Sequence, residues 1–129
     1  MKKKYLIVIA DYYQDITRGL LDSALKLIPK SNTIKIIRVP GVFEIPVTIS
    51  KNIKKYDGFL ALGCIIKGQT PHFDFISQAS TSAIMELSII NKKPIGNGII
   101  TCLNMRQAKT RKKKGTEAAK AVISVLSQK

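Results

Sequence analysis

Residues 59–75 read FLALGCIIKGQTPHFDF, an apolar run that passes into a polar segment carrying His72, the only histidine of the chain. The run from Phe59 to Ile66 is rich in Leu and Ile, which is typical of a strand covered on both faces of a parallel sheet. Gly68 and Pro71 mark a loop after this strand. Open α/β sheets bind ligands in loops at the carboxyl ends of their strands, so the stretch predicts a buried strand followed by a site.

His72 opens the helical stretch that follows the loop. Its imidazole and the free backbone N–H groups of a helix start then face the same crevice, and Lys67 adds positive charge, so an anionic substrate is expected. Histidine changes its charge near neutral pH and is suited to proton transfer. The alternative is a solvated histidine at the start of a helix, and these residues taken alone leave both interpretations open.

Length and composition indicate one domain over residues 1–129, since 129 residues with 45% hydrophobic content can form a real core and no linker is visible. No apolar stretch approaches the roughly 20 residues that cross a bilayer, and the lysine-rich start lacks a cleavage site, so a cytoplasmic location is expected. Cys64 and Cys102 lie in apolar runs, and their spacing predicts buried reduced thiols and no metal site.

The chain is strongly basic, with 22 Lys and Arg against 8 Asp and Glu and a formal net charge of +14. Such a balance raises the question of nucleic acid. The densest basic run, Lys109–Lys114, continues a helix-like segment and lacks the interleaved aromatic residues that stack on single strands. No zinc-finger, RRM or KH signature is present, so we do not expect nucleic acid as a partner. A solvated basic face and a non-catalytic basic binding or shell protein are the alternatives.

Outside residues 59–75, strands rich in β-branched residues alternate with amphipathic helices, which is typical of βαβ architecture. Right-handed crossovers place the helices on both faces of the sheet. The expected fold class is α/β, a flavodoxin-like three-layer αβα sandwich with a four-stranded parallel sheet. Such a small sheet leaves edges and helix faces uncovered, so an oligomer is expected.

The expected strands are Tyr5–Ala10, Thr33–Val39, Phe59–Ile66 and Ile95–Thr101. Three helices are expected between these strands: one with Ile16 to Ile28 that ends before Pro29, one from Phe43 to Ile53 with Pro46 in its first turn, and one from His72 to about Ile90 that ends before Lys93-Pro94. Two more are expected after the last strand. Asn104 could cap the first of them, and after an interruption at Gly115 the second carries Ala118 to Leu126.

Four segments of the chain resemble the lumazine synthase family, in the same order and over nearly the whole length. They are Arg38–Pro46 (RVPGVFEIP), Gly63–Asp74 (GCIIKGQTPHFD), Pro94–Thr101 and Lys114–Ala119 (KGTEAA). The first two are long and specific, the last is moderately so, and the third is weak by itself. The resemblance implies a cofactor-free condensation of 5-amino-6-ribitylaminouracil with 3,4-dihydroxy-2-butanone 4-phosphate to a lumazine, a step of riboflavin biosynthesis in which phosphate and water leave.

The resemblance also implies roles for single residues. His72 matches the family's proton-transfer residue. By the same resemblance, the other matching positions bind substrate. For the pyrimidine and the ribityl chain, Tyr12 stacks on the ring, Val42, Phe43 and Glu44 hold the ring and the ribityl chain, and the backbone of Cys64, Ile65 and Ile66 binds the uracil edge. The phosphate is received by Lys67, Gly68, Gln69 and Thr70 and bound by Arg111, and Asn97, Lys114 and Glu117 line the ligand. Tyr12, Glu44 and Arg111 also suit structural roles, as an exposed loop tyrosine, a first-turn helix residue and a member of the basic face.

Two departures from the family pattern concern subunit contacts and the substrate ring. Asn97 stands where the family usually carries a phenylalanine that covers the pyrimidine. The stretch Arg111–Lys114 is shorter than the family's glycine-containing loop, and the chain starts close to its first strand. The resemblance implies a homopentamer with active sites between subunits, and the short stretch and the start close to the first strand favour a free pentamer or a pair of pentamers over a sixty-subunit shell. The archaeal-type riboflavin synthase, which shares the fold, is the enzymatic alternative, and the motif Gly68–Asp74 favours lumazine synthase.

Overall fold

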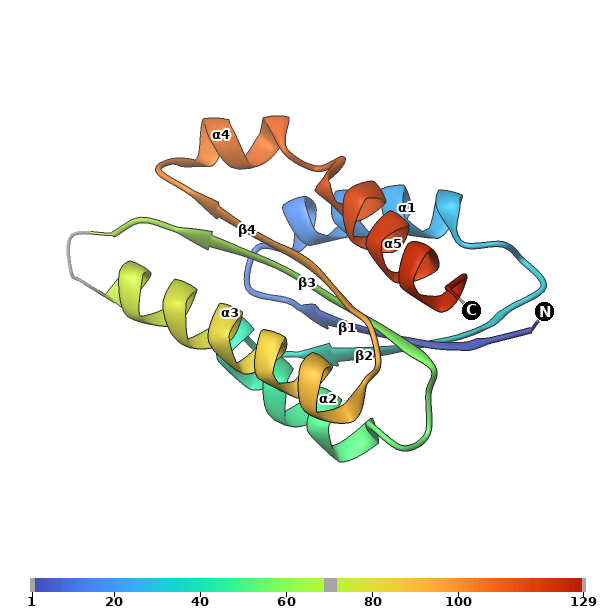
Figure 1. Ribbon diagram of the computed structural model, residues 1–129. Helices are drawn as coiled ribbons and strands as arrows, with labels where there is room; N and C mark the ends of the chain where they lie inside the picture. The colour runs from blue at the N-terminus through green and yellow to red at the C-terminus, as the bar shows by residue number, and fades with distance from the viewer. Residues whose placement is uncertain (1, 69–71, 129) are drawn as a thin grey trace.

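The computed structural model describes residues 2–68 and 72–128. Four parallel strands form one sheet in the order β2-β1-β3-β4. Helices α1, α4 and α5 cover one face of the sheet and α2 and α3 cover the other, which confirms the predicted three-layer α/β fold (Figure 1). The strands are β1 (Lys4–Ala10), β2 (Thr33–Val39), β3 (Gly58–Ile66) and β4 (Ile95–Cys102), and the helices are α1 (Gln14–Leu27), α2 (Ile45–Asn52), α3 (His72–Asn91), α4 (Met105–Thr110) and α5 (Lys114–Leu126).

The central strands β1 and β3 are buried along nearly their whole length. This burial explains their uninterrupted apolar composition, because helices cover both faces of the sheet. One core lies under α1 and α5 and includes Leu20 and Val122. The second core lies under α2 and α3 and includes Ile49, Phe59 and Ile84. The two cores hold the sheet rigidly, so the loops at its carboxyl edge start from fixed positions.

The predicted helix Phe43–Ile53 begins too early. The chain first forms a 3-10 helix, η1 (Val42–Glu44), and α2 begins only after it. The physical reason is a local turn, in which the backbone N–H of Gly41 donates to Oε1 of Glu44 over 3.0 Å. Pro46 lies in the first turn of α2, as predicted, where its missing N–H has no partner to lose.

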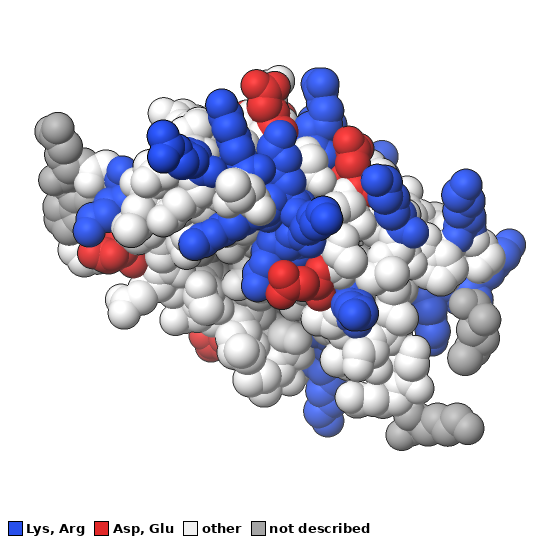
Figure 2. All heavy atoms as spheres, turned by 90° about the horizontal axis from the view of Figure 1, so that it is seen from above, with Lys and Arg blue, Asp and Glu red and all other residues white. Residues whose placement is uncertain are grey.

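The sequence suggested that the basic run Lys109–Lys114 continues one helix, but the structure shows that it does not. It spans the end of α4, a short connection and the start of α5. Gly115 lies inside the first turn of α5 and does not interrupt that helix, whereas Asn104 caps α4 as predicted, with its Oδ1 accepting from the backbone N–H of Gln107. Lys and Arg side chains spread over the face formed by α1, α4 and α5 (Figure 2).

The backbone of helix α5 packs directly against the backbones of α1 and β4. A Cβ on Gly115 would lie 2.0 Å from the carbonyl oxygen of Leu20 in α1. A Cβ on Gly96 in β4 would lie 2.2 Å from the carbonyl oxygen of Ala118 in α5. Only glycine permits contacts this close without moving the elements apart. Helix α5 is therefore held directly against both α1 and β4.

Both cysteines match their prediction, since Cys64 and Cys102 are buried and free. In the part of the chain that the structure describes, no helix combines the length and apolar character needed to span a membrane.

We predict that Gly115→Ala destabilises the protein by about 1–3 kcal/mol, because the new methyl group meets a main-chain atom that cannot rotate away. The free energy of unfolding from chemical denaturation, at equal protomer concentration, measures the effect. Gly68→Ala is the matched control, since a Cβ there meets nothing within 4 Å. An unchanged free energy of unfolding in Gly115→Ala would contradict the close approach of α5 to α1.

Candidate functional site

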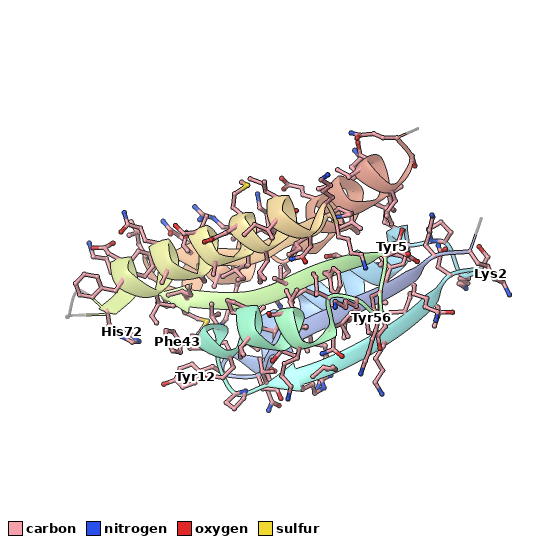
Figure 3. All side chains as sticks on the ribbon, turned by 60° about the horizontal axis from the view of Figure 1, so that its bottom comes forward. Lys2, Tyr5, Tyr12, Phe43, Tyr56 and His72 are labelled. Carbon is pink, nitrogen blue, oxygen red and sulfur yellow. The ribbon has the colours of Figure 1, made fainter. Side chains whose placement is uncertain are left out.

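A cavity of about 400 Å³ opens at the carboxyl edge of the sheet, a volume typical of small-molecule sites. Segments that follow β1, β2 and β3 line it together with the first turns of α3. Figure 3 shows Tyr12, Phe43 and His72 beside one another at this end of the sheet. The lining residues are Tyr12, Tyr13, Gly41, Val42, Phe43, Cys64, Ile65, Ile66, Gly68, His72, Phe73 and Ile76. We call this space the aromatic cavity.

Two exposed aromatic rings dominate the aromatic cavity. The side chain of Tyr12 is 76% exposed and that of Phe43 is 68% exposed, which is unusual for rings of this size. The ring of Tyr13 meets Tyr12 edge-on, with centroids 4.8 Å apart, and supports it from behind. A flat heterocycle fits such an arrangement, because stacking buries its two faces while its edges stay free for hydrogen bonds.

The segment that presents Tyr12 is fastened to the neighbouring strand. The backbone N–H of Asp11 donates to the carbonyl oxygen of Val39 over 2.9 Å. The guanidinium of Arg38 donates to the carboxylate of Asp11, also over 2.9 Å. Tyr12 therefore sits on a loop of fixed direction, although its own ring is exposed.

A second cavity, of about 640 Å³, lies along β4 and the start of α5. We call it the cationic cavity, because Arg111, Lys113 and Lys114 all line it. Its other lining residues are Thr81, Asn97, Ile99, Ile100, Thr101, Thr110 and Glu117. A cluster of one guanidinium and two ammonium groups suits the oxygens of a phosphate.

Hydrogen bonds orient the polar side chains of the cationic cavity. Nη1 of Arg111 donates to the carbonyl oxygen of Thr101 over 3.1 Å and lies 4.0 Å from Sγ of Cys102. The ammonium of Lys114 pairs with the carboxylate of Glu117 over 3.2 Å. Arg111 is thereby held against the end of β4.

Asn97 also lines the cationic cavity, from the edge strand β4. Its Oδ1 accepts a hydrogen bond of 3.0 Å from the backbone N–H of Ile99. The amide therefore caps an edge group of the strand and presents no apolar surface that could cover a ring.

The predicted site residues fall into two groups, and among the described residues no lining residue belongs to both cavities. Glu44 and Lys67 line neither cavity: Glu44 closes the turn at Gly41, and Lys67 is exposed, with its backbone N–H donating to Cys102. Gln69 and Thr70 lie outside the described residues. The aromatic cavity takes Tyr12, Val42, Phe43, Cys64, Ile65, Ile66, Gly68 and His72, and the cationic cavity takes Asn97, Arg111, Lys114 and Glu117.

Sequence reasoning missed several lining residues. Tyr13, Phe73 and Ile76 line the aromatic cavity. Their positions in the sequence could have indicated this, because Tyr13 adjoins Tyr12, Phe73 adjoins His72 and Ile76 follows His72 at helical spacing. Lys113 in the cationic cavity was hidden among its basic neighbours. Thr81 carries no local signal, because it reaches the cationic cavity only through the way α3 crosses β4.

Cys64 lines the aromatic cavity, and its side chain belongs to the core under α1 and α5. Burial, together with the neighbouring Cys102, raises the pKa of the Cys64 thiol to about 12. A thiol with such a pKa remains protonated and is a poor nucleophile near neutral pH. We therefore do not expect Cys64 to act as a nucleophile in this cavity.

Comparison with known proteins gives one consistent result. The family model described as 6,7-dimethyl-8-ribityllumazine synthase matches residues 2–129. A protein of that name from Agrobacterium fabrum is 38% identical over all of this chain and 97% of its own length. Relatives of the same name from Bartonella henselae and Cutibacterium acnes are 41% and 40% identical, over 99% and 96% of this chain and 89% and 80% of their own lengths.

We predict that the raised pKa of Cys64 makes stability fall at alkaline pH. The folded state prefers the protonated thiol, so its contribution is complete below the ordinary pKa of 9.0 and is lost as pH rises toward 12. Free energies of unfolding at pH 8.5 and 10.5 should therefore differ more for the natural chain than for Cys64→Ala. Equal differences in the two proteins would show that this thiol does not titrate differently in the folded state.

Proposed function

Because the chain belongs to the 6,7-dimethyl-8-ribityllumazine synthase family and is an enzyme of riboflavin biosynthesis, we propose that its two cavities together bind and join the two substrates of that reaction. These are 5-amino-6-(D-ribitylamino)uracil and 3,4-dihydroxy-2-butanone 4-phosphate, and the products are the lumazine, inorganic phosphate and water. The observation that carries the proposal is the aromatic cavity, where exposed rings meet the chain's single histidine. Of the two enzyme activities considered from the sequence, the family match supports this one rather than riboflavin synthase.

The aromatic cavity is the proposed site of the pyrimidine. The rings of Tyr12 and Phe43 offer stacking surface, and backbone groups at Cys64 to Ile66 offer hydrogen bonds to the uracil edge. In the condensation, the 5-amino nitrogen loses its protons as it forms a C=N bond with the ketone carbon, and the carbonyl oxygen leaves as water. His72 is proposed to move these protons and to assist phosphate elimination. Proton transfers of this kind need no cofactor or metal.

The cationic cavity is the proposed site of the phosphate, through Arg111, Lys113 and Lys114, with Glu117 holding the ammonium of Lys114. Three further residues are proposed to receive the phosphate from their motif alone, namely Lys67, Gln69 and Thr70. Glu44 is likewise proposed from its motif to contact the ribityl chain.

We propose that the active site forms between subunits, with the aromatic cavity of one subunit facing the cationic cavity of its neighbour. In a closed ring, every interface joins two different patches, so each subunit carries one half of two sites. The separation of the two cavities on this chain is what such a ring needs. Helix α3 supports association because it exposes large apolar side chains: Phe75, Met85, Ile89 and Ile90. The ring is proposed to be a homopentamer, free or paired.

A cytoplasmic location is proposed as well. The two buried free thiols, Cys64 and Cys102, suit a reducing compartment.

We predict that His72→Ala lowers the rate of lumazine formation by about a hundredfold or more, as expected for the loss of a general acid-base group. Arg111→Ala should raise KM for the butanone phosphate by about tenfold or more, because a charged hydrogen-bond donor is lost. Fluorescence of the lumazine product measures both, after subtraction of the uncatalysed condensation. No rate above this blank in a folded, oligomeric natural chain would refute the proposed function.

Mixing the two variants tests where the site forms. If each site joins two subunits, hybrids of His72→Ala and Arg111→Ala assembled by refolding together regain intact sites, about one in four for random assembly at equal amounts. At butanone phosphate concentrations well below the KM of Arg111→Ala, the activity of the hybrids should then exceed the mean of the separate variants. Hybrids with only that mean activity would place all site residues within one subunit.

We predict that Asn97→Phe lowers KM for the pyrimidine by about threefold to tenfold, because an added ring stacks on the bound heterocycle. Asn97→Ala is the matched control, since both variants lose the hydrogen bond to Ile99 but only one gains a ring. Equal KM values for the two variants would show that position 97 does not face the pyrimidine.

A further inference from the structure

The connection between α4 and α5 carries the cations of the cationic cavity, and its backbone is held by a helix that does not line that cavity. Arg111 and Lys113 both line the cationic cavity, and Lys112 lies between them. The ends of the connection are tied to their own helices: the N–H of Arg111 donates to the carbonyl of Ala108, and the N–H of Lys114 donates to the carbonyl of Arg111, each over 3.1 Å. The middle of the connection is tied to α1.

Ser23 of α1 makes this tie. Its hydroxyl lies 3.0 Å from the carbonyl oxygen of Lys112 and 3.0 Å from that of Leu20 in the preceding turn. Both carbonyl oxygens accept from the single proton of this hydroxyl and so share it, and the contact with Lys112 reaches across 89 positions of sequence. Ser23 is half-buried, so water competes weakly for this hydrogen bond.

Gly19, one turn before Ser23, supports the same connection. A Cβ at Gly19 would lie 2.6 Å from Cδ and 3.0 Å from Cβ of Lys112. The aliphatic stem of Lys112 therefore packs directly on the backbone of α1. Both the carbonyl and the side chain of Lys112 are fixed on α1, and this fixes the directions in which its two neighbours leave the backbone.

We propose that Ser23 is a positioning residue for the anion site of the cationic cavity: by holding the carbonyl of Lys112, its hydroxyl aims Arg111 and Lys113 at a phosphate ester. Ser23 touches no substrate in this arrangement and acts only through the connection. The inference rests on the proposed function, which assigns the phosphate to this cavity.

Thr116 provides a matched comparison between the same two helices. Its hydroxyl donates to the carbonyl oxygen of Ser23 over 3.1 Å. Thr116 belongs to α5, whose backbone the helix already fixes, and it does not line the cationic cavity. Loss of this hydroxyl weakens the contact of α1 with α5 and leaves the connection in place.

The test compares Ser23→Ala with Thr116→Val in steady-state kinetics, with each substrate varied in turn. Ser23→Ala should raise KM for the butanone phosphate by about threefold to tenfold, the range for one neutral hydrogen bond, and leave kcat and KM for the pyrimidine unchanged. Thr116→Val should lower the melting temperature about as much as Ser23→Ala does, because each variant loses one hydroxyl hydrogen bond, and should leave all three kinetic constants unchanged. A merely structural role of Ser23 would make the two variants alike, and that result would overturn the inference.

Arg111→Ala, measured in the same assay, separates this inference from the proposed function. If Arg111→Ala leaves KM for the butanone phosphate unchanged, the assignment of phosphate to the cationic cavity is wrong. If it raises this KM and Ser23→Ala does not, only the role of Ser23 is wrong. Should Ser23→Ala fail to fold, Gly19→Ala displaces the side chain of Lys112 from the same helix, and an unchanged KM for the phosphate ester in that variant would overturn the inference.

Discussion

The approach of α5 to both α1 and β4 is the constraint on which the rest of this structure depends. Gly115 brings the backbone of α5 onto α1, and Gly96 brings β4 onto the backbone of α5. Together these contacts leave almost no freedom in the start of α5. The connection from α4 must therefore follow one path, and Arg111 and Lys113 take their places beside β4 as a result.

The two cavities place two kinds of chemistry on different parts of one chain. The exposed rings of Tyr12 and Phe43 offer stacking surface in the aromatic cavity, whereas the cationic cavity gathers three cations that suit a phosphate. The aromatic cavity lies at the carboxyl ends of β1 and β3, and the cationic cavity lies along the outer strand β4. Helix α3 contributes to both cavities, through its first turns to the aromatic cavity and through Thr81 to the cationic cavity, whereas their other lining residues come from different elements.

Most of the fold could be predicted from the sequence because its signals are local. The apolar run ending at Ile66 and the breaks at Pro29 and Pro94 fixed the strands and most helix ends to within a residue or two. The start of α2 could not be predicted, because it depends on one side-chain contact between Glu44 and Gly41. The helix break within the basic run was hidden for a similar reason, since lysine and arginine suit helices and the contact that holds the connection comes from α1, far away in sequence.

Many of the residues that line the two cavities could be named from the sequence, but their division into two cavities could not. Motif order along the chain says nothing of which side of β3 each segment occupies, and β4 happens to lie on the side away from β1. Thr81 shows the same limit, because only the crossing of α3 over β4 brings it to Arg111. Spatial neighbours of this kind follow from packing rather than from any local pattern.

The positive surface has a consequence for how many copies can associate. Each copy brings a formal charge of +14, much of it spread over the face of α1, α4 and α5 (Figure 2). Contact energy grows in proportion to the number of interfaces, whereas unscreened repulsion grows with the number of pairs of copies. A larger assembly then depends on mobile anions, which shorten the Debye length and screen the repulsion between copies. In dilute salt, electrostatic self-energy alone favours a small ring over a closed shell.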